Sequence, residues 1–404
     1  MKNKLLYVVA SATQYQAPWS RVMAQDKRIH VSTLFYEDRK IGAQFDAGFG
    51  QAVQWDVPLL EGYPYQYLSE VAGGVLTSQK LVALWKIIDA KKFDIVWAHG
   101  YTDIYTIAAI LFAKMKGLTV FVRGDSALFP DAQKILKRKI IFYILDKFVD
   151  RYLTVGTENK KFYQRFGVSE KKMFMCGYAV DNDFFREKAL AAKNNLASLK
   201  KELNMIDERP IILFASKFSV GKRPMDLMQA YLQLAKNNHE NAPYLIFIGT
   251  GETFDAVKTV STKNNLEHVR FLGFKNQTEL PAYFALADIL VLPSMYEKWG
   301  LIINESMNAE CAIITTNYVG CRTDLVKPGE NGFIYPAKDV DALAHCLKML
   351  IENRELREKM KKKSGEIIAT WGLQESVDGI VAACESLENR QSPMRKHGIK
   401  QAWG

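Results

Sequence analysis

The stretch ADILVLPSMYEKWGLIINE, residues 287–305, decides how this 404-residue chain folds. Its apolar run at 289–292 ends in a Pro-Ser pair, which is typical of a buried strand that reaches a turn. Beyond Gly300 the spacing of the apolar residues becomes helical. A strand, a loop and a helix in this order form one unit of a parallel α/β sheet.

Two glutamates of this stretch fall where such a sheet binds ligands, at the carboxyl ends of its strands. Glu297 lies in the loop, and Glu305 lies about a turn and a half inside the predicted helix. Unpaired amides at a helix start can hold a phosphate without a metal. Those amides belong to Trp299, Gly300, Leu301 and Ile302. Glu305 can then accept both hydroxyls of a ribose, and Glu297 the hydroxyls of a sugar beyond the phosphates. The pattern suits a nucleotide-sugar.

Short apolar runs and helical intervals alternate along the whole chain, which predicts an α/β protein. Runs in the first half cover residues 4–10, 30–36, 93–99, 118–124, 151–156 and 173–180. Runs in the second half cover residues 211–217, 244–251, 269–274, 287–294, 312–317 and 332–336. We therefore predict doubly wound domains at 1–185 and 210–372, joined by a connection at 186–209. A C-terminal helix and basic tail, 373–404, should return towards the first domain.

Composition places the chain among soluble globular proteins, with 48% hydrophobic and 24% charged residues. No apolar run approaches the ~20 residues of a membrane span, and the apolar N-terminus is expected to be a core strand rather than a signal peptide. Five cysteines without a CxxC pair indicate reduced, mostly buried thiols in a cytoplasmic protein. The net charge of +10 favours anionic partners. Nucleic acid is not expected, because the basic residues are dispersed and no nucleic-acid motif is present.

Other strand ends of the second half add groups suited to a phosphorylated ligand. Lys217 ends one strand, and Lys222 follows five residues later, before a helix. A diphosphate must be neutralised by a cation or by fixed positive side chains, and two lysines provide the second solution. Gly251 permits close approach of backbone to a ligand, and Phe274 can meet a base. Neither a Walker A motif nor a GxGxxG fingerprint is present, which disfavours an NTPase or a dinucleotide enzyme.

Strand ends of the first half would face the same crevice. Candidates for contact with a reacting sugar are His99, Arg123 and Asp125. A structural hydrogen-bonding role for His99 is an equal alternative. The loop after the first strand lies by topology at the ligand edge of the sheet. Its candidates for acceptor contact are Gln14, Tyr15 and Trp19. The irregular segment 37–78, with Trp55, could form a sugar-binding wall or simply an ordered loop.

Two further patterns have open alternatives. Residues 134–151 hold six basic and two acidic residues on a helical pattern rich in large apolar groups. Such a helix can lie on an anionic membrane, as a peripheral contact, or be an ordinary helix with a solvated basic side.

The DxD spellings at 181–183 and 339–341 are expected to be structural, Asp339 as a helix N-cap. We predict no metal and no other cofactor.

Together these residues resemble the retaining GT-B glycosyltransferases of family 4, over nearly all of the second half. The E-x7-E pair of Glu297 and Glu305 is the family's best marker, and SKFSVGKRP (216–224) is similar to its phosphate loop. Segments 155–168 and 177–182 resemble members that build bacterial surface polysaccharides. The resemblance implies two Rossmann-like domains facing across a cleft, with the nucleotide on the second.

Carried over by position, Glu305 binds the ribose, Lys217 and Lys222 the diphosphate, and Glu297 the donor sugar. The implied reaction moves a sugar from a nucleotide-diphosphate donor to a glycan or lipid-linked acceptor, with retention and without a metal. The chain departs from the family in having Arg123 where a histidine is common, and Gln14 to Trp19 in place of a glycine-rich loop. The rival interpretations are a sugar-nucleotide epimerase on the same fold and a non-catalytic nucleotide- or glycan-binding protein.

Overall fold

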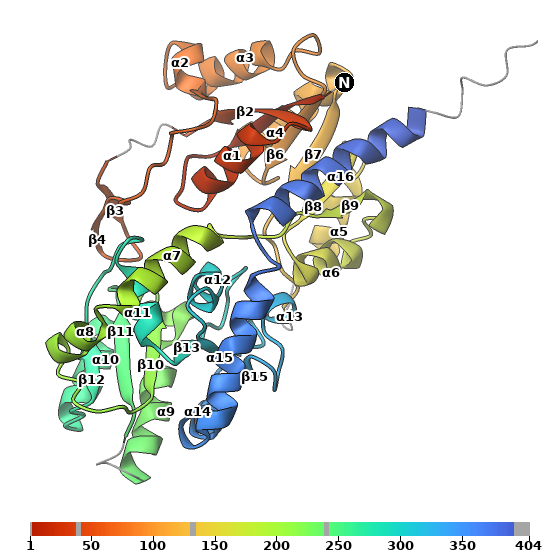
Figure 1. Cartoon of the computed structure of the whole chain (residues 1–404). Coiled ribbons are helices and arrows are strands. Elements are labelled where there is room, and N and C mark those ends of the chain that lie inside the picture. Colours follow the sequence, from red (N-terminus) through yellow and green to blue (C-terminus); the bar gives the residue numbers. More distant parts are fainter. Residues whose placement is uncertain (1, 38–41, 130–134, 238–241, 392–404) are drawn as a thin grey trace, which may run out of the picture.

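The computed structural model describes residues 2–37, 42–129, 135–237 and 242–391, and it consists of two α/β domains (Figure 1). The first domain is the upper one in Figure 1, and the second contains the stretch 287–305. Residues 392–404, most of the predicted basic tail, lie outside the described residues, as does Lys134 of the predicted basic helix.

The described residues of the first domain form a parallel sheet in the order β5-β2-β1-β6-β7-β8-β9. Its strands are β1 (Asn3–Val9), β2 (Ile29–Phe35), β5 (Tyr65–Tyr67), β6 (Ile95–His99), β7 (Thr119–Arg123), β8 (Arg151–Thr154) and β9 (Met173–Met175). Central strands such as β1 and β6 are buried on both faces, as expected for a parallel sheet between helix layers.

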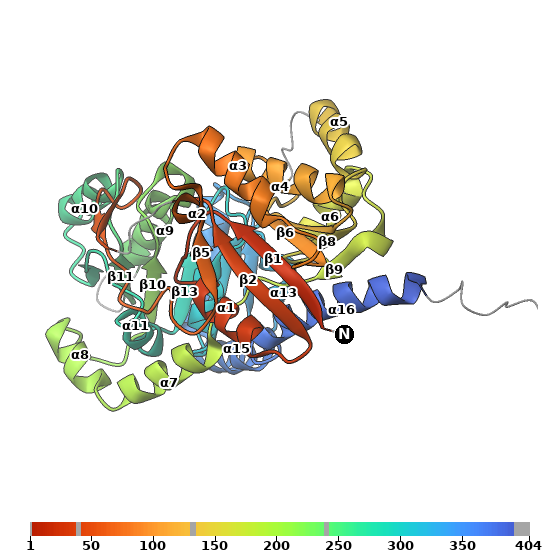
Figure 2. The same ribbon diagram turned by 90° about the horizontal axis from the view of Figure 1, so that it is seen from above.

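Two layers of helices cover this sheet, as the view from above shows (Figure 2). One layer holds α1 (Gln16–Gln25) and α16 (Leu373–Gln391), whose apolar residues share a core with β1 and β6. The other layer holds α2 (Leu68–Ala72), α3 (Thr77–Ile87), α4 (Ile104–Met115), α5 (Ile135–Leu145) and α6 (Thr157–Arg165). The return of α16 to the first domain therefore has a packing cause, since Val377, Ile380 and Cys384 are buried there.

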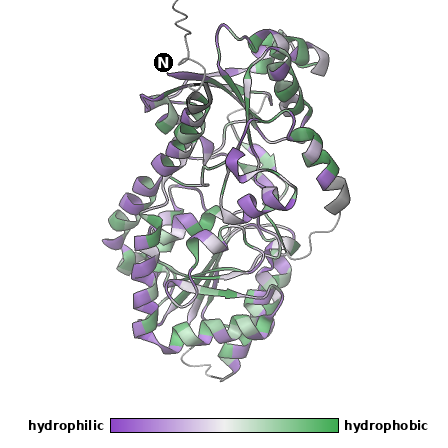
Figure 3. Cartoon of the chain, turned by 90° about the vertical axis from the view of Figure 1, so that its right-hand side faces the viewer, coloured by the Kyte–Doolittle hydropathy of each residue, from purple (hydrophilic) through white to green (hydrophobic). Residues whose placement is uncertain are grey.

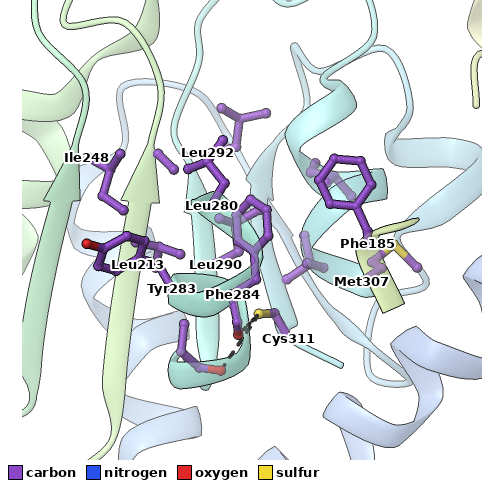
Figure 4. Close-up of a cluster of buried hydrophobic side chains, with 14 of the residues drawn as sticks. Phe185, Leu213, Ile248, Leu280, Tyr283, Phe284, Leu290, Leu292, Met307 and Cys311 are labelled. Carbon is purple, nitrogen blue, oxygen red and sulfur yellow. Dashed lines mark hydrogen bonds between the residues drawn. The ribbon is translucent and has the colours of Figure 1, made fainter. Parts of the chain in front are cut away.

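The second domain repeats the plan with a parallel sheet in the order β12-β11-β10-β13-β14-β15. Its strands are β10 (Ile211–Ala215), β11 (Tyr244–Ile248), β12 (Val269–Phe271), β13 (Ile289–Leu292), β14 (Ala312–Thr316) and β15 (Gly332–Tyr335). The helices are α9 (Pro224–Asn237), α10 (Phe254–Lys263), α11 (Leu280–Leu286), α12 (Leu301–Met307), α13 (Arg322–Leu325), α14 (Val340–Glu352) and α15 (Arg354–Ile368). Figure 4 shows one of its cores, where Phe284 and Leu290 pack near Met307 and Cys311. In Figure 3 the helices of both domains carry hydrophobic and hydrophilic residues, as amphipathic covers of a sheet should.

The predicted connection is two helices, α7 (Asn182–Lys193) and α8 (Leu196–Glu202). Phe185 of α7 and Leu203 after α8 are buried in the core of the second domain. The connection is thus packed against that domain rather than extended between the two.

The predicted strands are confirmed, and the apolar N-terminus is the buried strand β1. Several runs are longer than their strands: the run at 173–180 is a strand only to Met175, and the run at 269–274 only to Phe271. Past Met175 the amides of Cys176 and Tyr178 still bond to carbonyls at and just after β8, before α7 begins at Asn182. A second difference is β5 and the hairpin of β3 (Gln44–Asp46) and β4 (Gln51–Val53), which the irregular sequence of 37–78 did not reveal.

Among the described helices, none is long and apolar enough to cross a bilayer. All five cysteines are free thiols, and each is buried except the partly exposed Cys346.

Candidate functional site

The two sheets point their carboxyl ends at a cavity of about 610 Å³, lined by residues of both domains. Many of the residues predicted from the sequence meet there. They are Gln14, Tyr15 and Asp125 from the first domain, and Lys217, Lys222, Phe274, Glu297, Trp299, Gly300, Leu301, Ile302 and Glu305 from the second. A cavity of this size is typical of small-molecule sites.

Glu305 lies about one turn inside α12, slightly nearer the helix start than predicted, and its side chain is completely buried. Neither carboxylate oxygen makes a hydrogen bond of standard length and angle to the described residues. Burial raises the pKa of Glu305 to about 8, and the nearby polar side chains of Tyr15 and Gln277 oppose that shift. A buried carboxylate that lacks good donors is costly, so this position favours a ligand that brings hydroxyl groups.

Lys222 and Glu297 form an ion pair inside the cavity. Lys222 ends a 3-10 turn, Val220–Lys222, that follows β10, and the backbone of Glu297 bonds to the segment after β14. Burial and the neighbouring ammonium of Lys217 lower the pKa of Lys222 to about 8, while the Glu297 carboxylate favours its charged form. A ligand can therefore replace this ion pair: its negative charge can bind Lys222, and its hydroxyl groups can bind Glu297.

Lys217 follows β10 and pairs with a residue of the other domain. Its Nζ lies 2.8 Å from Oδ1 of Asp46 and 4.8 Å from the centre of the Phe49 ring. Burial raises the pKa of Asp46, whereas the hydrogen bond and the positive charge of Lys217 lower it. The net result is a pKa of Asp46 below its usual value. Asp46, Phe49 and Trp55, all from the region of the β3–β4 hairpin, line the cavity.

Glycines line the cavity at one strand end and at one helix start. Gly249 after β11 has φ 122°, and a Cβ there would lie 2.0 Å from the carbonyl oxygen of Ser216. Gly300 has φ 101° and begins α12. Side chains would strain the backbone at both positions, so these glycines let the chain turn tightly at the cavity.

Gly251, predicted to bind the donor, does not line this cavity; its neighbour Gly249 does. A Cβ on Gly251 would lie 2.7 Å from the carbonyl oxygen of Gly48 in the first domain. The close approach anticipated for Gly251 is therefore to protein backbone.

His99, Arg123 and Trp19 also lie away from the cavity lining. Nδ1 of His99 bonds to the Tyr7 hydroxyl at 2.7 Å, and burial together with Arg123 lowers the pKa of His99 to about 3, which keeps the imidazole neutral. The Arg123 guanidinium is buried, donates to the carbonyl of Cys176 at 2.9 Å, and lies 4.3 Å from the Trp19 ring. Of the three candidates for sugar contact, only Asp125 lines the cavity, paired with Lys298 at 3.0 Å.

Residues of both domains line the cavity without having been predicted from the sequence. Asp46 and Phe49 carry no motif, and 171 positions separate Asp46 from Lys217. Gln277 and Tyr178 likewise had no local signal. Trp55 was noted only as an alternative sugar-binding wall.

The DxD segments are helix starts in the structure. Asp181 accepts a hydrogen bond from the amide of Phe184 at the start of α7, and Asp339 accepts one from Ala342 at the start of α14. Both first aspartates are N-caps, as expected for that residue type.

Comparisons with known proteins bear on the family and the fold of this chain. Residues 197–366 match the family model of glycosyl transferases group 1. The UDP-Gal:alpha-D-GlcNAc-diphosphoundecaprenol alpha-1,3-galactosyltransferase of Escherichia coli is 23% identical over 310 residues, 75% of this chain and 78% of that protein. The GalNAc-alpha-(1->4)-GalNAc-alpha-(1->3)-diNAcBac-PP-undecaprenol alpha-1,4-N-acetyl-D-galactosaminyltransferase of Campylobacter jejuni is 25% identical over 289 residues, 70% and 72% of the two chains. The fold is similar to that of Anabaena HepE in complex with UDP, with a TM-score of 0.73, 16% identity, and coverage of 96% of this chain and 100% of that one.

Proposed function

Because this chain is a GT-B glycosyltransferase of the family 4-like type, we propose that it moves a sugar from a nucleoside-diphosphate donor to a lipid-linked saccharide, with retention at the anomeric carbon. The buried carboxylate of Glu305 is the observation that carries the donor assignment. It faces a cavity that also holds two lysines, and a ribose supplies two hydroxyls while a diphosphate supplies the opposite charge. The E. coli relative acts, by its name, on a UDP-sugar and a diphosphoundecaprenol acceptor, which supports the same classes of substrate.

In the proposed reaction the bond between the anomeric carbon and the diphosphate oxygen breaks, and a bond to the acceptor oxygen forms on the same face. The leaving diphosphate takes the proton of the acceptor hydroxyl. Negative charge grows on the diphosphate as its bond breaks, so Lys217 and Lys222 stabilise the transition state more than the ground state. Fixed ammonium groups thereby supply the charge that a metal supplies elsewhere. Glu297 then holds hydroxyls of the donor sugar after it leaves Lys222.

A thermal-shift panel tests the donor assignment. The panel contains nucleoside diphosphates and nucleotide-sugars with different bases, and UDP is the first probe. We expect the compounds that carry one particular base to raise the melting temperature of the chain, because a ligand bound only by the folded chain stabilises it. The same nucleotide-sugar incubated with enzyme alone should give no isomeric nucleotide-sugar. Stabilisation by no member of the panel would contradict the assignment of a nucleotide-sugar donor. An isomer formed from donor alone would contradict a transferase and favour the epimerase alternative.

We further propose that the first domain rests on an anionic membrane through the exposed apolar face of α3, α4 and α5, which lie on one side of the sheet (Figure 2). On α5, Ile140, Ile141, Tyr143 and Ile144 are exposed beside Lys139 and Lys147. On α4, exposed apolar residues recur at Ile104, Ile107, Leu111 and Met115. Apolar side chains framed by lysines fit an acidic lipid surface, and a lipid-linked acceptor resides there.

Vesicle sedimentation tests the membrane contact. The double variant Ile141→Glu with Ile144→Glu should bind vesicles containing phosphatidylglycerol about 100-fold or more weakly than the unchanged chain, since each isoleucine contributes on the order of 1.5–3 kcal/mol when fully buried. Ile206→Glu is the matched control, because Ile206 is 89% exposed in the second domain. Equal binding of the unchanged chain to neutral and anionic vesicles would remove the idea.

A further inference from the structure

The β3–β4 hairpin and the residues after it form an arm, residues 44–56, that reaches from the first domain to the second (Figure 1). Its two strands pair with each other and with no other described strand. The arm is held by contacts to the second domain instead. Thr250 donates to the carbonyl of Phe49 at 2.7 Å, and Asn276 donates to the carbonyl of Gln54 at 2.7 Å.

The arm carries two carboxylates that make different contacts, Asp46 at the end of β3 and Asp56 at the end of the arm. Asp56 accepts hydrogen bonds from the amide and the hydroxyl of Thr278, outside the cavity lining. Asp46 lines the cavity and places both carboxylate oxygens 2.8 and 2.9 Å from Nζ of Lys217. The arm also packs closely there, since a Cβ on Gly48 would lie 2.6 Å from the Lys217 side chain.

We propose that Asp46 is a built-in competitor of the donor: it occupies the ammonium of Lys217 until the diphosphate of a nucleotide displaces it. The inference rests on the proposed function, which gives Lys217 a diphosphate to bind. Both oxygens of Asp46 contact the Lys217 ammonium, and the negative charge of Asp46 repels a diphosphate placed beside the same ammonium, so the two anions compete for Lys217. A ligand without a diphosphate leaves Asp46 in place. Asp46 therefore sets how strongly the site favours diphosphates over uncharged nucleosides.

The exposed fractions of Asp46 and Lys217 set the size of the effect. Their side chains are 30% and 37% exposed, so water screens the pair and its net contribution is that of a partly exposed ion pair. Displacement by a diphosphate is then easy, and loss of the competing carboxylate should tighten diphosphate binding about 3- to 5-fold.

Calorimetric titration of Asp46→Asn with UDP tests the proposal. We expect UDP to bind the variant about 3- to 5-fold more tightly than the unchanged chain, while uridine binds both equally. Asp56→Asn is the matched control: it weakens the docking of the same arm at Thr278 and should leave UDP affinity unchanged. The same titrations with inorganic pyrophosphate test the proposal if the nucleotide of the donor does not contain uracil, because pyrophosphate carries the diphosphate charge without a base.

Each other outcome has a distinct meaning. UDP affinity that is equal or weaker in Asp46→Asn overturns the proposal, because Asp46 then holds Lys217 in place for the donor. A gain that Asp56→Asn shares also overturns it, because release of the arm as a whole would then be the cause. Failure of UDP and pyrophosphate to bind any variant would instead contradict the proposed function.

Discussion

Replacing Lys222 by alanine lowers the rate of sugar transfer about 100-fold or more, in the expectation that each fixed donor to the leaving group contributes like an oxyanion-hole group. Lys222 lines the cavity and is partly buried, with 24% of its side chain exposed; the other described lysines that line the cavity are Lys217, Lys275 and Lys298. Removal of Lys222 also leaves Glu297 without its ion-pair partner. The loss should fall on kcat more than on donor KM, because charge on the diphosphate grows towards the transition state.

Single-turnover assays of transfer measure this effect. Lys222→Arg should retain more activity than Lys222→Ala, because it keeps the charge, and the exposed Lys263→Ala serves as a surface control in the same domain. An unchanged rate in Lys222→Ala would exclude the assigned phosphate loop. The pH profile gives a second readout. The pKa of Lys222 is lowered to about 8, so kcat/KM for the donor should decline as pH rises through that value and the ammonium loses its charge.

Replacing Glu305 by glutamine should weaken donor binding about 10- to 100-fold, since hydrogen bonds to a charged acceptor contribute about 1.5–3 kcal/mol and the amide accepts through one atom only. The same variant should be more stable than the unchanged chain at pH 8 in the absence of ligand. Burial raises the folded-state pKa of Glu305 from 4.5 to about 8, so the folded chain holds a proton that the unfolded chain releases. That contribution to stability is complete below about pH 4.5 and is lost as pH rises from about 4.5 to 8.

Chemical denaturation at pH 5.5 and pH 8 separates these effects. The unchanged chain should lose unfolding free energy between the two values, and Glu305→Gln should lose less. Glu355→Gln, an exposed change on α15, controls for the general effect of pH. Parallel pH dependence of Glu305→Gln and the unchanged chain would show that Glu305 is ionised in the empty site. Unchanged nucleotide affinity would remove its assignment to the ribose.

The donor side of the site could be predicted from the sequence because its residues belong to strand ends. The apolar run of β13 and the helical spacing after Gly300 place Glu297 and Glu305 at one edge, and the run of β10 places Lys217 there too. Parallel strands bring their carboxyl ends to a common edge, so residues that are far apart in sequence meet without a local signal between them. Gly251 shows the limit of this reasoning. The end of β11 does reach the cavity, but Gly249 lines it and Gly251 does not.

The first-domain side was less predictable, since a strand end can face a core as well as a crevice. Arg123 ends β7, but its guanidinium is enclosed by Trp19 and Tyr178, at 4.3 Å from each ring. Only the packing of those rings shows that this charge is held inside the protein. A sequence position cannot distinguish a buried, paired arginine from one that reaches a ligand.

The sequence by itself determined two parallel α/β sheets, the edge of each at which ligands bind, and the glutamates and lysines at that edge of the second sheet. These follow from apolar periodicity and turn residues, which act over a few neighbouring positions. Only the tertiary structure decided which groups face those residues: Tyr15 and Gln277 near Glu305, and Asp46 on Lys217. Tyr15 and Asp46 come from the docking of the first domain on the second, and Gln277 comes from the loop between β12 and α11. Each contact depends on the packing of the whole fold rather than on any local pattern.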